Sequence, residues 1–229
     1  MHAATADLFA SLPPSMAREQ LAEGAWVLRG FALDQDKTLL GDVDAIAGAA
    51  PFRHLVTPGG FTMSVAMTNC GALGWVSDRR GYRYDALDPL SGMPWPPMPA
   101  AFAQLAANAA DAVGFHGFRP NACLVNRYAP GARLTLHQDR DEGNYEQPIV
   151  SVSLGVPATF LFGGDVRNER QQRVPLQHGD VVVWGGPARM RFHGVLPLRA
   201  GAHELTGGQR INLTFRAATP MTGRRRGSG

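Results

Sequence analysis

Two segments in the first half of the chain carry apolar residues at the spacing of a half-buried α-helix. The first helix is predicted to begin after a cap at Asp34, and the second to begin at Pro99 and end at Gly114. Between them, five prolines from Asp88 to Pro99 exclude a regular element and predict a surface segment. The apolar positions are Leu39, Leu40, Val43, Ile46 and Ala47 in the first helix, and Phe102, Leu105, Ala106, Ala109, Ala110 and Val113 in the second.

From residue 121 onward the apolar pattern changes to the period of two that is typical of β-strands. Short apolar runs are separated by Gly and Pro, which favours a sandwich or jelly roll over βαβ units. We therefore expect a mainly β protein with flanking helices, forming a single domain over residues 1–229. The predicted strands are 122–128, 133–138, 149–154, 158–162, 180–184 and 210–216.

Composition narrows the class of protein only slightly. Hydrophobic residues make up 45% of the chain, enough for a sizeable core, and the net charge of +3 is compatible with nucleic acid without requiring it. Two isolated cysteines indicate a reducing compartment. The sequence has neither a signal-peptide pattern nor an apolar run near the roughly 20 residues of a membrane span. We expect a cytoplasmic protein with no membrane partner.

His137 and Asp139 stand at the end of a predicted strand. Side chains at positions i and i+2 of a strand project from the same face, so both can reach one ion. A histidine and a carboxylate at this spacing supply two ligands of the facial triad that binds non-haem iron. The third ligand must come from elsewhere, and His178 and His193 are the alternatives. His178 stands in a turn, where a hydrogen-bonded histidine is the simpler interpretation.

Segment 210–216 alternates completely between polar and apolar residues. Its apolar face suits the core. If its polar face lines a barrel interior, the two arginines there require anionic partners, which a dicarboxylate would supply through bidentate pairs. The alternative is a strand with a solvated polar face. The polar residues are Arg210, Asn212, Thr214 and Arg216, and Asn126, Arg127 and Tyr128 of an earlier strand are expected to add contacts to the same ligand.

At these residues the sequence resembles the AlkB family of Fe(II)/2-oxoglutarate-dependent dioxygenases, in its bacterial alkylated-DNA repair demethylase branch. The resemblance runs from about Leu21 to Ala217. Its motifs, in order, are TPGGFTMSVAMTNCG, LGW, NRYAPGA, LHQDRDE, VSVSLG, HGDVVVWGG and RINLTFR. It implies a double-stranded β-helix (jelly-roll) core at residues 120–217 with an N-terminal nucleotide-recognition lid at 50–100. Residues 1–20 would be an N-terminal extension, and 218–229 a disordered basic tail.

The resemblance also implies roles for the polar residues around the predicted metal. It favours His193 over His178, so that His137, Asp139 and His193 hold iron. Asn126, Tyr128 and Arg210 match residues that grip the far carboxylate of 2-oxoglutarate, while Asn212 and Arg216 match residues near its keto-acid end. Ile211 departs from the aromatic residue that the family often has, and we expect it on the buried face.

For the substrate, the resemblance implies a second group of residues. Trp75 matches the aromatic residue that, with His137, sandwiches the damaged base. Asp141 matches a carboxylate that reads its exocyclic amino group, and Arg167 matches a residue beside the substrate. The three consecutive residues Tyr82, Arg83 and Tyr84 fall in a segment that touches the nucleic-acid backbone.

Segment 74–84 has the composition of a nucleic-acid contact, with three aromatic residues and three arginines within eleven residues. Aromatic faces stack on unpaired bases and arginines meet phosphates, and an enzyme can reach a base only after it leaves the helical stack. The alternative is a surface loop whose aromatic residues cover the core.

The function implied is oxidative demethylation of 1-methyladenine and 3-methylcytosine. The expected partner is alkylated DNA, preferably single-stranded, with double-stranded DNA and RNA as further candidates. Fe(II), 2-oxoglutarate and O2 would be consumed or bound, and formaldehyde, succinate and CO2 released, by a monomer. Two alternatives stay open: an oxygenase of the same type acting on a protein or small molecule, and a non-catalytic cupin-like metal or nucleic-acid binding module.

Overall fold

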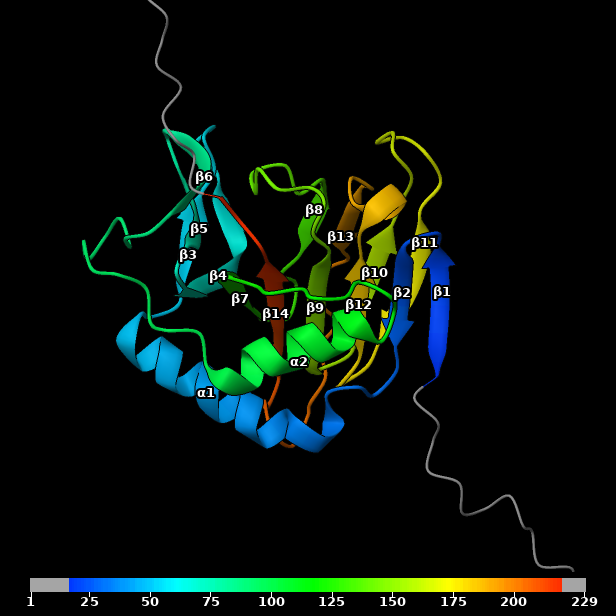
Figure 1. Cartoon of the computed structure of the whole chain (residues 1–229). Helices are drawn as coiled ribbons and strands as arrows, with labels where there is room; N and C mark the ends of the chain where they lie inside the picture. The colour runs from blue at the N-terminus through cyan, green and yellow to red at the C-terminus, as the bar shows by residue number, and fades with distance from the viewer. Residues whose placement is uncertain (1–16, 220–229) are drawn as a thin grey trace, which may run out of the picture.

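Two antiparallel sheets form the core of residues 17–219, the part of the chain that this computed structural model describes. The larger sheet has eight strands in the order β1-β2-β12-β9-β14-β7-β4-β3, the smaller has four in the order β11-β10-β13-β8, and β5 and β6 pair by themselves (Figure 1). The strands of the larger sheet are β1 (Arg18–Ala22), β2 (Ala25–Leu28), β3 (Arg53–Val56), β4 (Thr62–Gly71), β7 (Ala122–Tyr128), β9 (Ile149–Gly155), β12 (Val181–Trp184) and β14 (Arg210–Arg216). The others are β5 (Gly74–Asp78), β6 (Gly81–Asp85), β8 (Leu134–His137), β10 (Ala158–Phe162), β11 (Gln172–Leu176) and β13 (His193–Val195).

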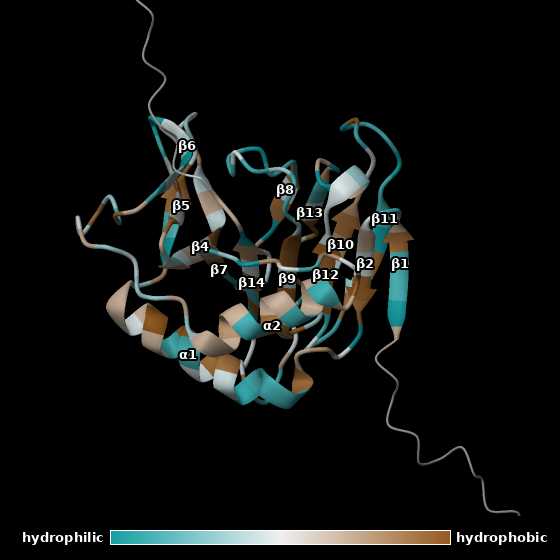
Figure 2. Cartoon of the chain, viewed as in Figure 1, coloured by the Kyte–Doolittle hydropathy of each residue, from teal (hydrophilic) through white to brown (hydrophobic). Residues whose placement is uncertain are grey.

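The helices are α1 (Asp36–Ala49) and α2 (Ala100–Asp111), with short 3-10 turns η1 (Leu33–Gln35) and η2 (Gly186–Ala188). Both α-helices pack on the outer face of the larger sheet (Figure 1). Figure 2 shows hydrophobic residues on most strands of the two sheets, both kinds of residue along the helices, and hydrophilic residues on β1 and on many of the loops. The fold is the mainly β jelly roll with flanking helices that the sequence predicted.

The structure confirms the predicted strands of the second half. Strands 122–128, 158–162 and 210–216 have the predicted bounds, and the other three differ by one residue at one or both ends. The sequence did not predict the other eight strands of the described residues, at 18–22, 25–28, 53–56, 62–71, 74–78, 81–85, 172–176 and 193–195. Strand β4 lacks a simple alternation because it is buried over most of its second half, including the polar residues Thr68 and Asn69.

The start of the first helix was predicted wrongly. Asp34 lies in η1, and α1 begins at Asp36 after Gln35, which makes no side-chain cap. Asp36 is held instead by a tertiary contact, since its carboxylate lies 3.0 Å from Nε2 of His178. The helix nevertheless buries the predicted stripe, including Leu39. The start of the helix is therefore fixed by His178, which is distant in the sequence, and not by the predicted side-chain cap at Asp34.

Strand β14 separates the two cores of the molecule. Its apolar residues, Ile211 among them, pack with the helices, where the rings of Phe215 and Phe102 meet edge to face at 5.7 Å. Its polar residues point the other way, between the two sheets. The alternation read from the sequence is thus confirmed, and the solvated-face alternative is wrong because Arg210 and Arg216 are both buried.

The predicted boundaries of the outer segments need correction. The extension assigned to residues 1–20 overlaps β1, an edge strand of the larger sheet, and its residues 1–16 lie outside the described part. The lid assigned to 50–100 contains β3 and β4, which belong to the larger sheet, so only the β5–β6 hairpin is a separate sheet. Most of the tail predicted at 218–229 also lies outside the described residues. Within residues 17–219 no helix combines the length and the apolar character needed to cross a bilayer.

Candidate active site

A cavity of about 660 Å³ lies between the two sheets. The polar face of β14 forms one wall, and the predicted metal ligands lie at its side. Aromatic residues of the β5–β6 hairpin line its mouth, including Trp75 and Tyr82. The predicted metal ligands, the predicted anion contacts and the predicted base contacts thus line the same cavity.

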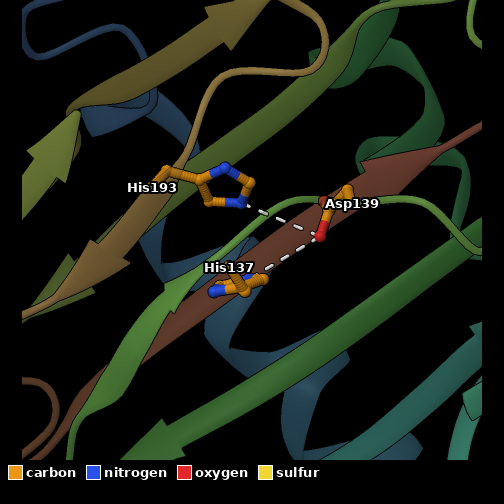
Figure 3. A group of neighbouring side chains, drawn as sticks. All are labelled: His137, Asp139 and His193. Carbon is orange, nitrogen blue, oxygen red and sulfur yellow. Dashed lines mark ion pairs between the residues drawn. The ribbon is translucent and has the colours of Figure 1, made fainter. Parts of the chain in front are cut away.

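His137, Asp139 and His193 come together because β8 and β13 pair in antiparallel register. His137 and His193 are direct partners in that register, with ring centres 4.4 Å apart. Their Nε2 atoms lie 3.6 and 3.7 Å from Oδ1 of Asp139, which directly follows β8 (Figure 3). The ligand atoms of all three lie within 4.8 Å of one another. Two imidazole nitrogens and one carboxylate oxygen on one side form the donor set of a facial triad for Fe(II).

The two histidines have the tautomer that a metal requires. Nδ1 of His137 lies 2.8 Å from the carbonyl oxygen of Thr135, and Nδ1 of His193 lies 3.0 Å from that of Arg191. Each Nδ1 must therefore carry the proton and donate it, which leaves Nε2 with a free lone pair. Burial also lowers the pKa of His193 to about 4, so the ring is neutral at physiological pH.

Asp139 stays ionised although it is buried. Burial alone would raise its pKa, but the guanidinium of Arg216 and the neighbouring histidines hold the pKa well below its usual range. Nδ1 protonation of the histidines and ionisation of Asp139 together leave two imidazole lone pairs and one carboxylate oxygen for a divalent cation. The residues present therefore fit the iron that the sequence implied.

Arg210 is a buried cation without an acidic partner among the described residues. Its Nη2 donates to Oγ of Ser153 at 2.9 Å, while its Nε and Nη1 find no hydrogen-bond acceptor. The hydroxyl of Tyr128, whose ring centre lies 4.9 Å from the guanidinium, is also unpaired. Burial lowers the pKa of Arg210, because the charged guanidinium is removed from water. A carboxylate entering here would satisfy all of these donors, so this end of the cavity fits one end of 2-oxoglutarate.

The other polar residues of β14 are already paired. The amide of Asn212 donates to Ser151 and accepts from Asn126 at 3.2 Å, and Arg216 is bonded to Asp139. Arg127, in contrast, was predicted wrongly as a cosubstrate contact. Successive residues of β7 point to opposite faces, so the Arg127 side chain lies on the outer face, with its guanidinium 4.3 Å from the centre of the Phe52 ring.

The predicted base contacts meet at the mouth of the cavity. The rings of Trp75 and Tyr82 stack at 5.5 Å with an interplanar angle of 12°. The indole Nε1 of Trp75 donates to the carboxylate of Asp141 at 3.0 Å. His137, the most exposed of the three metal ligands at 38%, lines the same space. An aromatic wall and a carboxylate therefore stand next to the metal position.

Two neighbours of Tyr82 do not reach the cavity. Tyr84 was predicted wrongly as a nucleic-acid contact, since it is only 4% exposed and its hydroxyl donates to Glu142. Arg83 projects from the other side of the hairpin, where it pairs with Asp78 at 3.0 Å. Arg167 is exposed on the loop between β10 and β11, with its guanidinium 5.8 Å from the Phe192 ring. Contacts of Arg83 and Arg167 with a nucleic acid remain predictions.

His178, the rival third ligand, is a structural residue. Its Nδ1 accepts a hydrogen bond from the amide of Gly155 at 2.8 Å, and its Nε2 contacts Asp36. Sequence reasoning missed Glu142 and Arg189, which form a buried ion pair at 3.1 Å beside the site. Glu142 stands in the motif LHQDRDE and could have been suspected, whereas nothing near Arg189 in the sequence signals its position.

Comparisons with known proteins agree with this geometry. The chain matches the model of the 2OG-Fe(II) oxygenase superfamily over residues 24–216. It is 58% identical to the alpha-ketoglutarate-dependent dioxygenase AlkB of Salmonella typhimurium, over 93% of this chain and 97% of that protein. It is 56% identical to the protein of the same name from Escherichia coli, with the same coverage.

A solved structure gives the same result for the fold. The structure of OsALKBH1 superimposes with a TM-score of 0.76 at 29% identity, covering 87% of this chain and 99% of the other. The likeness therefore extends over both sheets and is not confined to the metal-binding motif.

Proposed function

The chain belongs to the AlkB family of Fe(II)- and 2-oxoglutarate-dependent dioxygenases, and we propose that it removes methyl groups oxidatively from 1-methyladenine and 3-methylcytosine in nucleic acid. Single-stranded DNA is the preferred substrate in this proposal, with RNA and double-stranded DNA as further candidates. The observation that carries it is the position of Trp75, Tyr82 and Asp141 at the mouth of the same cavity that holds His137 and Asp139.

His137, Asp139 and His193 would hold the iron. Arg210 and Tyr128, with Asn126 beside them, would hold the far carboxylate of 2-oxoglutarate, and Asn212 and Arg216 would lie near its other end. When bound, Fe(II), 2-oxoglutarate and O2 supply the oxidation of an N-methyl group, with formaldehyde, succinate and CO2 as products. The protein contributes orientation, because the residues that would hold the cosubstrate and those that would hold the base line one cavity.

At the mouth, the flat wall of Trp75 would stack on a base that has left its helix. Asp141 would attract the positive charge that N-methylation places on these bases, and its second oxygen can accept from an exocyclic amino group. Single-stranded DNA costs least to unstack, which supports the strand preference. Arg79 and Arg80, exposed at the tip of the hairpin, would meet phosphates.

Formaldehyde release from a short oligonucleotide that carries one 1-methyladenine tests the proposal. We expect release that requires 2-oxoglutarate, and faster release from a single strand than from the matched duplex. Methylated peptides serve as the competing substrate class. Stimulation of 2-oxoglutarate turnover by a peptide and not by the oligonucleotide would overturn the assignment. The proposed monomeric state is checked separately by light scattering during gel filtration.

A further inference from the structure

The β5–β6 hairpin carries the base contacts, yet it forms a sheet of its own. Within residues 17–219, two side-chain hydrogen bonds join it to the loop that follows the metal-ligating strand β8. One runs from Trp75 to Asp141 at 3.0 Å, and the other from the hydroxyl of Tyr84 to Oε1 of Glu142 at 3.1 Å. Asn69 and Ser77 tie the hairpin to the larger sheet. Asp141 itself belongs to the proposed base subsite, so of the two bonds to the metal-site loop only the second is free when a base is bound.

Glu142 is a buried carboxylate that meets two arginines. It is 2% exposed; its Oε1 lies 3.3 Å from Nε of Arg216, and its Oε2 accepts from Nη2 of Arg189 at 3.1 Å. Both arginines also hold Asp139, Arg216 through the carboxylate and Arg189 through the backbone carbonyl oxygen at 3.1 Å. Two carboxylates and two guanidinium groups thus balance in charge, and Glu142 connects both cations that fix the metal-ligating aspartate.

Tyr84 connects Glu142 to the base subsite. Tyr84 and Trp75 are direct partners in the register of β5 and β6, so a shift of one moves the other. Tyr84 is buried, and its hydroxyl has one strong acceptor, the carboxylate of Glu142. A continuous path of contacts therefore runs from Trp75 through Tyr84, Glu142 and Arg216 to Asp139.

We propose that Glu142 is a positioning residue that aligns the base-binding hairpin with the metal and cosubstrate site, using Tyr84 as its contact on the hairpin. The assignment of a base to the hairpin rests on the proposed function. Through Glu142, the position of Trp75 relative to Asp139 is fixed by a buried network of charge-assisted hydrogen bonds. Such a network restrains side-chain positions more tightly than contacts between exposed side chains do. Loss of this alignment would separate cosubstrate consumption from demethylation.

The first test uses the protein without metal or cosubstrate. Amide hydrogen exchange is measured over the hairpin and, as an internal reference, over β7. Tyr84→Phe removes only the hydroxyl, and we expect exchange of the hairpin to become about tenfold faster, as for loss of one buried hydrogen bond to a charged group. Exchange in β7 should not change. Tyr145→Phe is the matched control, since that hydroxyl bonds to the carbonyl oxygen of Arg140 in the same loop and does not touch Glu142.

The second test uses the holoenzyme with the methylated oligonucleotide. For Tyr84→Phe we expect formaldehyde formed per succinate to fall about threefold or more, while succinate formation without oligonucleotide stays within about twofold of wild type. Glu142→Leu removes the acceptor and should lower the same ratio. It should also raise the KM for 2-oxoglutarate, because Arg216 loses one of the contacts that fix its position. In the double variant Tyr84→Phe/Glu142→Leu the ratio should be no lower than in Glu142→Leu alone, since the hydroxyl of Tyr84 has already lost its acceptor.

Unchanged hairpin exchange in Tyr84→Phe would overturn the proposal, as would additive effects in the double variant. Equal losses of uncoupled turnover and demethylation would also overturn it, since they indicate a general loss of structure. If the wild-type protein releases no formaldehyde from the oligonucleotide, the proposed function fails. The exchange measurement then decides by itself whether Glu142 holds the hairpin.

Discussion

The guanidinium of Arg216 donates both of its hydrogen bonds to one oxygen of Asp139, from Nε at 2.8 Å and from Nη2 at 2.6 Å to Oδ2. The other oxygen, Oδ1, is the one that lies 3.6 and 3.7 Å from the two histidines. The two oxygens of the carboxylate therefore have different roles. Arg216 fixes its plane and keeps it ionised, and the remaining oxygen points to the metal position.

Replacement of this carboxylate should abolish cosubstrate turnover. Asp139→Ala removes one of three metal ligands and leaves Arg216 with only Glu142 as an anionic partner, so we expect succinate formation to fall about 100-fold or more. Asp34→Asn, an exposed aspartate beside α1, is the control and should leave turnover unchanged. Wild-type turnover in Asp139→Ala would show that this residue is not a ligand.

Arg210 should stabilise the bound cosubstrate at a cost to the free protein. Arg210→Met keeps a similar volume and removes a buried, unpaired charge, so the ligand-free protein should unfold at the same temperature as wild type or higher. The KM for 2-oxoglutarate should rise about 10- to 100-fold, in line with a lost charged hydrogen bond of about 1.5–3 kcal/mol. Thermal unfolding with and without 2-oxoglutarate measures both effects. A variant that 2-oxoglutarate stabilises as much as wild type would contradict the assignment.

The stability of the metal-free protein should depend on pH through His193. Its pKa is about 4 in the folded state and about 6.5 when unfolded, so below pH 6.5 the unfolded chain binds the extra proton. This contribution is therefore fully present above pH 6.5 and is lost as the pH falls to 4, by about 3 kcal/mol in total. Urea unfolding of wild type and His193→Gln over this range measures the difference in slope. His116→Gln, at an exposed histidine, should retain the wild-type slope, and an equal slope in all three proteins would refute the prediction.

Replacement of Trp75 should weaken binding of the methylated oligonucleotide and leave turnover of 2-oxoglutarate unchanged. Trp75→Ala removes the stacking surface, worth about 1–3 kcal/mol per base, so the KM for a methylated oligonucleotide should rise about tenfold or more. Succinate formation without oligonucleotide should stay near wild type. Trp75→Phe keeps a ring but loses the bond to Asp141, and its effect should be intermediate. If Trp75→Ala loses both activities equally, the indole serves the core and not the base.

Arg79 and Arg80 should contribute affinity without sequence preference. Arg80 is 72% exposed and is paired only with the partly exposed Asp78, so it is free to exchange that partner for a phosphate. Gln at both positions should weaken binding to all single strands about equally and reduce the slope of log K against log salt by about 1 to 1.5. Arg119→Gln combined with Lys37→Gln makes the same charge change on exposed residues at the helix side and should leave the slope unchanged. An unaltered slope in the first double variant would end the idea.

The sequence by itself determined the periodic parts of this protein. Strand β14 could be read completely, since alternation fixes which side chains share a face whatever the strand packs against. The pair His137 and Asp139 could be read for the same reason. The third ligand could not be derived from spacing, because a histidine far along the chain reaches the site only through the pairing of β8 with β13.

Only the tertiary structure decided which polar groups are paired. Arg210 and Arg216 look equivalent in the sequence, yet one is left without an acid among the described residues and the other is held by Asp139. Tyr82 and Tyr84 share one face of a strand, but Tyr84 is buried, where its hydroxyl donates to Glu142. Such differences depend on residues brought together from distant segments, and in a buried site the partner of a charge, more than the charge itself, decides what it can bind.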